Sequence, residues 1–384
     1  MLRRALKIFG LALLAALGGM LALGWQAFGR TAEGERLERM RHSPQWLGNS
    51  FENPQPLRND FAGSISAMFK SGRFTAPVGA IPVERTKGTQ YKIAPTSGLR
   101  VTWFGHSSTL VEIDGARVLT DPVFSERVSP YPWLGPKRWY PPPVTFGDLP
   151  AIDVVVISHD HYDHLDMHTV KLLLAGKAIF VVPLGIGAHL AYWGIPTERI
   201  VELDWWQETQ VGRLRVVLTP ARHASGRWLV DFNKKLWGGF ALIGKKKRVY
   251  YSGDTGLFPA MKEIGRRLGP FDLTMIEVGQ YNRSWPDWHI GPEQAVKAHR
   301  WVNGRTMLPV HWGLFVLAAH NWTEPIERVL REAEPHGVRV ATPKPGEAFE
   351  PAQAAADLRF VKRWWPAVEW QSAAEHPIIS TQVE

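Results

Sequence analysis

Short apolar runs separated by polar breaks recur along the chain from about residue 100 onward. Each run is three to five residues long, a length typical of β-strands, and most are rich in β-branched residues. Several early runs follow one another without a helical pattern between them. The strands predicted in this way are Val101–Phe104, Leu110–Ile113, Val118–Thr120, Val154–Ile157, Ile179–Val182, Leu214–Leu218, Phe240–Ile243, Val249–Tyr251 and Leu273–Ile276.

Helical patterns lie mostly later in the chain. They predict helices over His168–Ala175, Pro259–Leu268, Pro292–Val302 and Glu324–Ala333. Proline near the start of the last two segments is compatible with the first turn of a helix. Successive strands with helices interspersed predict an α/β fold, in which sheets pack face to face and helices cover their outer sides.

An uncharged apolar run extends from Ile8 to Gly29 and follows three basic residues. About 20 apolar residues are enough to cross a bilayer as a helix. We therefore expect residues 1–29 to form a transmembrane anchor. A signal peptide cleaved near Ala22-Leu23-Gly24 is the alternative, although the apolar cores of signal peptides are usually only about 7–15 residues long.

The basic residues before this run favour a cytoplasmic N-terminus, which would export the main domain. Arg30, Arg36, Arg39 and Arg41 follow the run and weaken that asymmetry. A domain on the cytosolic face therefore stays an alternative, and cleavage of the segment would instead give a secreted protein.

The remaining chain divides where its pattern changes. Residues 30–96 are interrupted by prolines and are predicted to form an arm on the main domain, which spans residues 97–350 and precedes a tail at 351–384. Within the main domain, the proline-rich residues 130–150 include two tryptophans, Trp133 and Trp139. Loops of this length are often functional, and the aromatic side chains make this one a candidate surface for acyl chains.

Composition narrows the chemistry. The chain has no cysteine, so thiolate metal ligands and disulfides are excluded, and a metal site must use histidine and carboxylate groups. The formal net charge of +9 favours phosphate-bearing partners such as anionic lipid, although a solvated basic surface would give the same charge. No nucleic-acid-binding signature is recognisable, so no nucleic-acid partner is expected. The oligomeric state stays open.

The segment His159-Asp160-His161-Tyr162-Asp163-His164 directly follows a predicted strand. Three of the 14 histidines of the chain lie within these six positions, interleaved with two aspartates. A tight loop at a strand end can direct several of these side chains toward one point. Imidazole and carboxylate groups suit zinc, so the segment predicts a metal site.

Three further candidate ligands come later in the chain. His223 follows Leu214–Thr219, Asp254 follows Val249–Tyr251, and His311 follows Met307–Val310. Each is a polar residue just past the carboxyl end of an apolar strand, where loops on a rigid scaffold concentrate site residues.

This order of residues, H-x-H-x-D-H followed by His, Asp and His, resembles the hallmark of the metallo-β-lactamase superfamily over residues 100–345. The resemblance implies an αββα sandwich and a hydrolase in which two zinc ions activate water, with Asp163 and Asp254 as catalytic carboxylates. It assigns His159, His161 and His223 to the first ion, Asp163, His164 and His311 to the second, and Asp254 to both.

A narrower resemblance is to the N-acylphosphatidylethanolamine-hydrolysing phospholipase D branch. It is carried by Trp103–Ser108, Thr120–Phe124 and His311-Trp312-Gly313. In that branch a tyrosine inside the histidine motif and a later histidine contact the substrate, and the resemblance assigns these roles to Tyr162 and His289. The segment Glu277-Val278-Gly279-Gln280-Tyr281 departs from the branch's usual Ile-Pro-Ile-Gly-Ala-Tyr-like stretch.

Two more histidines are candidates for the site. His106 is predicted either to support the site or contact substrate, or to be structural, and His320 is a candidate for binding substrate at the cleft mouth.

Three functions are compatible with these features. The favoured one is a phosphodiesterase or phospholipase D acting on N-acylphosphatidylethanolamine-like lipids at a membrane. The second is a hydrolase of a lactone or another ester on the same scaffold, since a fold does not dictate its substrate. The third is a membrane-tethered metal-binding protein without activity, which is disfavoured because no predicted ligand is missing.

Overall fold

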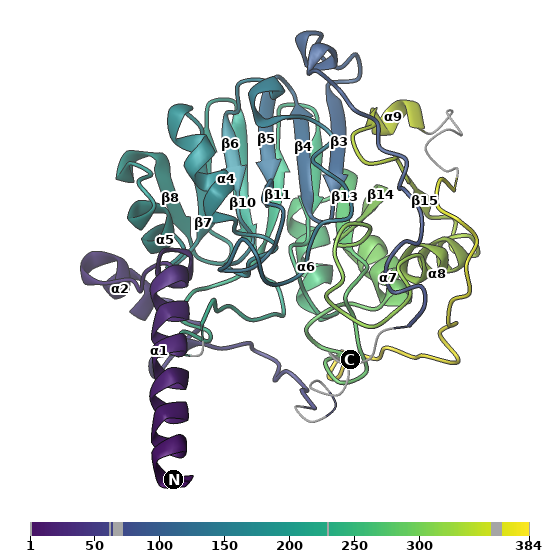
Figure 1. The fold of residues 1–384 in the computed structure, drawn as a ribbon. Coiled ribbons are helices and arrows are strands. Elements are labelled where there is room, and N and C mark those ends of the chain that lie inside the picture. Colours follow the sequence, from purple (N-terminus) through teal and green to yellow (C-terminus); the bar gives the residue numbers. More distant parts are fainter. Residues whose placement is uncertain (1, 61–62, 64–71, 229, 355–362, 384) are drawn as a thin grey trace.

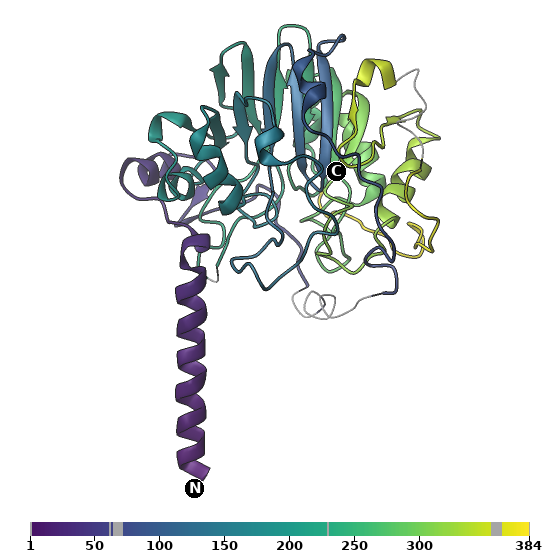
Figure 2. The same cartoon turned by 45° about the horizontal axis from the view of Figure 1, so that its top comes forward.

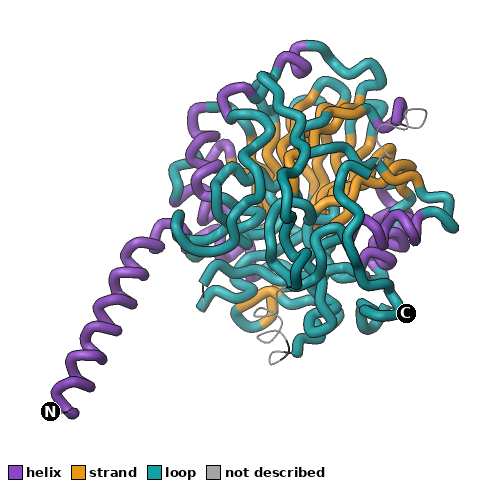
Figure 3. Tube along the Cα trace, turned by 45° about the vertical axis from the view of Figure 1, so that its right-hand side comes forward, coloured by secondary structure: helices purple, strands orange, loops and turns teal. Residues whose placement is uncertain are grey.

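Two seven-stranded sheets pack face to face, and helices lie against their outer faces (Figure 1, Figure 3). The computed structural model describes residues 2–60, 63, 72–228, 230–354 and 363–383. This architecture confirms the predicted αββα sandwich.

The first sheet contains the early strands and one late strand. These are β3 (Leu99–Gly105), β4 (Ser108–Ile113), β5 (Ala116–Thr120), β6 (Val154–Val156), β7 (Ile179–Pro183), β8 (Ile200–Leu203) and β16 (Ala348–Phe349). Their order in the sheet is β16-β3-β4-β5-β6-β7-β8.

The second sheet contains the later strands. These are β9 (Glu208–Val211), β10 (Leu214–Thr219), β11 (Gly239–Ile243), β12 (Arg248–Tyr251), β13 (Phe271–Glu277), β14 (Gly304–Val310) and β15 (Arg339–Val340). Their order is β15-β14-β13-β12-β11-β10-β9, and a separate small sheet pairs β1 (Trp46–Leu47) with β2 (Ser50–Phe51).

Helices connect and flank the strands. The α-helices are α1 (Leu2–Phe28), α2 (Gly34–Arg41), α4 (Met167–Leu172), α5 (Gly187–Tyr192), α6 (Ala260–Leu268), α7 (Pro292–Trp301), α8 (Glu324–Ala333) and α9 (Pro351–Ala354). Short 3₁₀ turns are η1 (Thr89–Lys92), η2 (Phe146–Asp148), η3 (Leu173–Ala175) and η4 (Thr197–Arg199).

Neighbouring residues of the first sheet face opposite layers. Val111 and Val118 pack in the core between the sheets, whereas Leu110 and Leu119 pack in a second cluster with the residues of α4 and α5. Side chains alternate between the two faces of a strand, so a strand covered on both faces is apolar at consecutive positions. This double burial explains why the strands of this sheet appear in the sequence as continuous apolar runs.

All nine strands and all four helices predicted from the sequence are present, within one to three residues at their ends. The predictions missed the helices α2, α5 and α9 and the strands β1, β2, β8, β9, β15 and β16. The short helix α5 begins at Gly187, and β9 has no buried residue and therefore no apolar run that could reveal it.

The predicted membrane segment folds as α1, which projects from the sandwich (Figure 2). Among the residues that the structure describes, no helix is both long and apolar enough to cross a membrane. The predicted anchor is therefore unsupported by the structure. The end of α1 contacts the main domain, because the Trp193 indole donates to the carbonyl of Gln26 (2.8 Å) and Arg227 Nε donates to that of Ala27 (2.8 Å).

The directions of the strands place many chain turns at one edge of the sandwich. In the second sheet β12, β13 and β14 are parallel, and β10 shares their direction through the antiparallel strand β11. In the first sheet β5 and β6 are parallel, and β3 shares their direction through β4. The segments that follow these seven strands therefore leave each sheet at the same edge, the one at which the carboxyl ends of these strands lie.

The arm and the tail both contact the loop that follows β10. Asn53 of the arm donates to the carbonyl of His223 (2.7 Å) and accepts from its backbone N–H (3.1 Å). The buried guanidinium of Arg222 donates to the carbonyl of Thr381 in the tail (2.7 Å) and forms an ion pair with Asp287 (2.9 Å). Both segments thus support the loop that follows β10.

Candidate metal centre

Three imidazoles converge at the carboxyl ends of β6 and β10. His159 Nε2 lies 2.9 Å from His161 Nδ1, which in turn lies 3.3 Å from His223 Nε2. These three nitrogens are close enough together to bind a single cation. A set of three imidazoles is a ligand set that zinc uses.

A second set of ligand atoms adjoins the first. Asp163 Oδ2 and Asp254 Oδ2 both face the Nε2 atoms of His164 and His311. From His164 Nε2 the carboxylate oxygens are 3.3 Å and 3.1 Å away, and from His311 Nε2 they are 3.4 Å and 3.0 Å away. The structure therefore brings all seven sequence-predicted ligands together in two adjoining sets.

Asp254 lies between the two sets. Its Oδ2 atom is 3.8 Å from His159 Nε2 and 3.9 Å from His223 Nε2, in addition to its contacts with His164 and His311. Its other oxygen, Oδ1, is buried and makes no hydrogen bond with any residue that the structure describes. A buried oxygen without a partner is costly, and a bound cation would compensate for it. The residues present therefore fit a metal pair.

The ring nitrogens that point away from this centre are held by the protein. Nδ1 of His159 lies 2.9 Å from Ser158 Oγ, and Nδ1 of His223 lies 2.8 Å from the carbonyl of Trp288. Two carboxylates do the same, because Asp121 lies 2.6 Å from Nδ1 of His164 and Glu277 lies 3.3 Å from Nδ1 of His311. Metal-binding histidines are usually oriented by such contacts of the second nitrogen.

Electrostatics differ between the two sets. Burial lowers the pKa of the His159 and His223 imidazoles well below the ordinary value, so both are neutral, as a cation requires of its ligands. For His311 burial acts in the same direction, but the Asp254 and Asp163 carboxylates outweigh it and raise the pKa to about 10. Burial would raise the pKa of Asp254, yet the adjacent His164 and His311 hold it well below its usual range.

The backbone is strained at two of the strand ends. His311 has a φ of 65° and His106 has a φ of 54°, in the left-handed region that side chains other than glycine rarely adopt. The two turns stabilise each other, because the N–H of His311 donates to the carbonyl of His106 (2.9 Å) and the N–H of His106 donates to that of Trp312 (3.1 Å). Such strained positions concentrate at functional sites.

The remaining predicted residues lie at different distances from this centre. His106 Nε2 is 2.9 Å from Asp163 Oδ2, so this histidine supports a ligand. His289 lies at the rim, with Nδ1 2.9 Å from Glu277 and 3.7 Å from Asp254. The Tyr162 hydroxyl donates to the carbonyl of Arg227 (3.0 Å), and the guanidinium of Arg227 lies 3.9 Å from the centre of its ring.

No contact among the described residues links His320 to either ligand set. Its ring stacks on Tyr281 at 4.5 Å, its Nε2 accepts from the backbone N–H of Gln280 (2.8 Å), and its Nδ1 lies 3.1 Å from the carbonyl of Asn321. Burial lowers its pKa to about 4. Its predicted contact with substrate stays a prediction.

Sequence reasoning assigned no role to two carboxylates of the site. Asp121 follows β5 and binds the N–H of Ser158 (2.7 Å) as well as His164, and Glu277 ends β13. The rule that found His223, Asp254 and His311 would have found both, since each lies at the carboxyl end of a predicted apolar strand.

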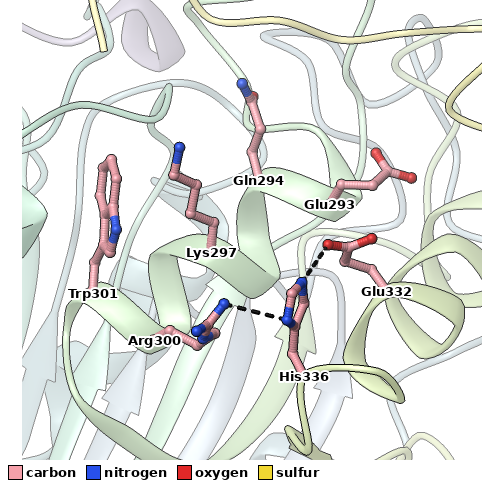
Figure 4. Close-up of a pocket in the computed structure, with 7 residues that line it drawn as sticks. All are labelled: Glu293, Gln294, Lys297, Arg300, Trp301, Glu332 and His336. Carbon is pink, nitrogen blue, oxygen red and sulfur yellow. Dashed lines mark hydrogen bonds and ion pairs between the residues drawn. The ribbon is translucent and has the colours of Figure 1, made fainter. Parts of the chain in front are cut away.

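A cavity of about 490 Å³ lies beside α7 and the end of α8, apart from this centre (Figure 4). Its charged walls pair with one another, because His336 lies 3.4 Å from Arg300 and 3.0 Å from Glu332. No predicted site residue lines it. A cavity of about 390 Å³ is closer to the centre and is lined by Tyr162, Arg227 and residues of the 124–132 loop.

Known proteins resemble this chain in sequence and structure. Residues 116–312 match the β-lactamase superfamily domain. An uncharacterized protein of Mycobacterium tuberculosis is 47% identical over 384 aligned positions, which cover 95% of this chain and 100% of the relative. The N-acyl-phosphatidylethanolamine-hydrolyzing phospholipase D 1 of Caenorhabditis elegans is 40% identical over 231 positions, which cover 57% of this chain and 65% of the relative.

Among solved structures, a metallo hydrolase from the archaeon Ignicoccus hospitalis superimposes with a TM-score of 0.52 at 25% identity. The superposition covers 66% of this chain and 98% of the archaeal protein.

Proposed function

Because the chain belongs to the metallo-β-lactamase superfamily, we propose that it is a dinuclear zinc phosphodiesterase that cleaves N-acylphosphatidylethanolamine-like lipids as a phospholipase D does. The family match and the similarity to a metallo hydrolase support metal-dependent hydrolysis. The second ion, the preference for zinc and the lipid substrate are the parts that we propose.

One observation supports this proposal most strongly. Two adjoining sets of imidazole and carboxylate atoms share Asp254, whose Oδ2 atom lies within 4 Å of nitrogens from both sets. Two zinc ions bound there would lower the pKa of water and neutralise the charge on phosphoryl oxygens.

The protein's own residues orient these groups. Asp163 is fixed by His106 (2.9 Å), so its carboxylate keeps its direction toward the second set and can accept a proton there. His289 is partly exposed at the rim, 15% of its side chain being accessible, and can donate to or accept from a head group. Tyr162 is held by Arg227 beside the 390 Å³ cavity, where it can orient the substrate.

A lipid substrate is supported by three features. A phospholipase relative is 40% identical over 57% of this chain, and the net charge of +9 favours anionic phosphates. Exposed apolar side chains, among them Trp133 and Trp228, lie on loops near α1, where the ring of Trp228 is 4.5 Å from that of Phe28. We propose that the enzyme acts at a membrane surface and that the main domain is exported.

Product analysis tests the proposal. The purified zinc-loaded protein is incubated with N-acylphosphatidylethanolamine, with phosphatidylcholine and with a lactone. Release of phosphatidic acid from the first lipid, lost in His161→Ala and retained in the matched control His336→Ala, would support it. Lactone opening without phosphodiester cleavage would refute the proposed substrate and assign the enzyme to the ester hydrolases.

A further inference from the structure

The buried carboxylate of Glu277 links three parts of the metal centre. It is the last residue of β13, and it begins the segment that departs from the phospholipase D branch, so the resemblance assigns it no role. Its side chain is inaccessible to solvent. A buried carboxylate must be compensated by hydrogen bonds or by charge, and the partners of Glu277 show what it does.

The first carboxylate oxygen binds the backbone. Oε1 accepts from the N–H of Thr255 and from that of Ile290 (3.3 Å). Thr255 follows the shared ligand Asp254, and Ile290 follows the rim residue His289. One oxygen therefore ties both loops to the end of β13.

The second oxygen faces two imidazoles. Oε2 lies 2.9 Å from Nδ1 of His289 and 3.3 Å from Nδ1 of His311. The two rings stack with centroids 5.1 Å apart and an angle of 15° between their planes. Because Nδ1 of His311 faces Glu277, its Nε2 faces the ligand oxygens of Asp254 and Asp163.

We propose that Glu277 is a positioning residue that orients His311 as a ligand of the second ion and His289 toward the substrate. This inference rests on the proposed metal-dependent function. A carboxylate that holds the remote nitrogen of a ligand imidazole fixes the ring orientation and increases its basicity. Glu277 hydrogen-bonds the His289 ring (2.9 Å) and forms an ion pair with Nδ1 of His311 (3.3 Å), which also lies 3.4 Å from the carbonyl of Gly279. One carboxylate therefore couples the geometry of the ion to that of the rim.

Metal binding tests the inference without any substrate. Zn²⁺ is titrated against a chromogenic chelator with the full-length protein and with Glu277→Gln, which keeps an oxygen acceptor for the two backbone N–H groups. One of two ions should bind roughly 10–100-fold more weakly in the variant. The absorption spectrum of the Co²⁺-loaded protein should change as well, because the ligand His311 is no longer held in one orientation.

Two further variants make the result specific. Glu112→Gln removes another buried carboxylate, one that pairs with Arg100 (2.5 Å) in the first sheet, and it should leave both ion affinities unchanged. Glu277→Asp keeps the charge but shortens the side chain, and it should weaken binding of the same ion. This variant provides the test if Glu277→Gln does not fold.

Activity provides a separate readout. With any substrate that the enzyme turns over, Glu277→Gln should lower kcat and raise KM even at saturating zinc, because His289 is released together with His311. Wild-type ion affinities and Co²⁺ spectrum in both Glu277 variants would overturn the positioning role while leaving the proposed function intact. A wild-type chain that binds no divalent ion would overturn the proposed function, and this inference with it.

Discussion

Two buried clusters of ionised groups differ in how their charge is balanced. Between α7 and α8, Arg328 donates to Glu293 (2.8 Å) and Glu324 (3.0 Å), and Glu324 also accepts from the hydroxyl of Tyr281 (2.8 Å). At the strand ends, Asp163, Asp254 and Glu277 form ion pairs with histidines alone among the described residues.

This difference indicates a structural role for the first cluster and a metal-binding role for the second. A carboxylate cluster that contains its own guanidinium is complete and contributes to the fold. A cluster whose carboxylates form ion pairs only with imidazoles, with one buried oxygen unpartnered among the described residues, is complete only when a cation binds. The first cluster should therefore respond to mutation in stability, and the second in metal content and catalysis.

Asp254→Ala should have the largest effect. Because its carboxylate lies between both ligand sets, its removal should deplete both ions and lower kcat/KM by more than about 10³-fold, beyond the loss of a single electrostatic contact. Elemental analysis and steady-state kinetics measure the two effects. The far-UV circular dichroism should stay unchanged, and full retention of two ions would contradict the shared position of Asp254.

Arg328→Met should have the opposite signature. It keeps the apolar stem but leaves the buried Glu324 without its cation, which should lower the free energy of unfolding by about 3–5 kcal/mol. Denaturant unfolding measures this loss. The ion content of the folded variant should remain that of the wild type, and a loss of ions would show that the two clusters are coupled.

The pH dependence of the unfolding free energy should also distinguish the cluster that contains Arg328 and Glu324. Burial would raise the pKa of Glu324, but His376, His320 and Tyr281 outweigh it and lower the pKa to about 2. A lowered folded-state pKa stabilises the protein above the unfolded value, near 4.5, and this contribution is lost as pH falls toward 2.

Glu324→Gln should therefore flatten the decline of the unfolding free energy over this interval, by no more than about 3 kcal/mol. Acid titration of metal-free protein, followed by tryptophan fluorescence, checks it. A variant with the wild-type acid profile would contradict the low pKa of Glu324.

Asn53→Ala should have the smallest effect on the metal centre. Its amide binds the peptide of His223 at both N–H and carbonyl, so its loss should loosen one ligand of the first ion. We expect that ion to bind about 10-fold more weakly, at the low end for a supporting contact. Chelator competition measures the change, and the second ion should bind as in the wild type.

Much of the centre could be predicted because strand direction determines where it forms. His159, His223, Asp254 and His311 each follow an apolar strand, and parallel strands bring their carboxyl ends together. The same rule could have identified Asp121 and Glu277, whose role was missed because neither belongs to the histidine motif. The strands themselves were predictable because burial on both faces makes them continuously apolar.

Other features depend on contacts that leave no local signal. Asn53 and His223 are 170 positions apart, and nothing near either residue indicates their pairing. The packing of His320 on Tyr281, and the hydrogen bond that it accepts from Gln280 across 40 positions, are likewise invisible in the local sequence. The exposed strand β9 is polar in sequence because only its backbone belongs to the sheet.

The ligand sets also have a mechanical consequence, because each draws on both sheets. His159 and His161 follow a strand of the first sheet and His223 follows one of the second, and the same holds for Asp163 and His164 against Asp254 and His311. Bound ions would therefore cross-link the two sheets, and separating the sheets would require breaking metal–ligand bonds. Removing the metal should lower the free energy of unfolding, so proteases should cleave the metal-free protein faster than the metal-bound protein.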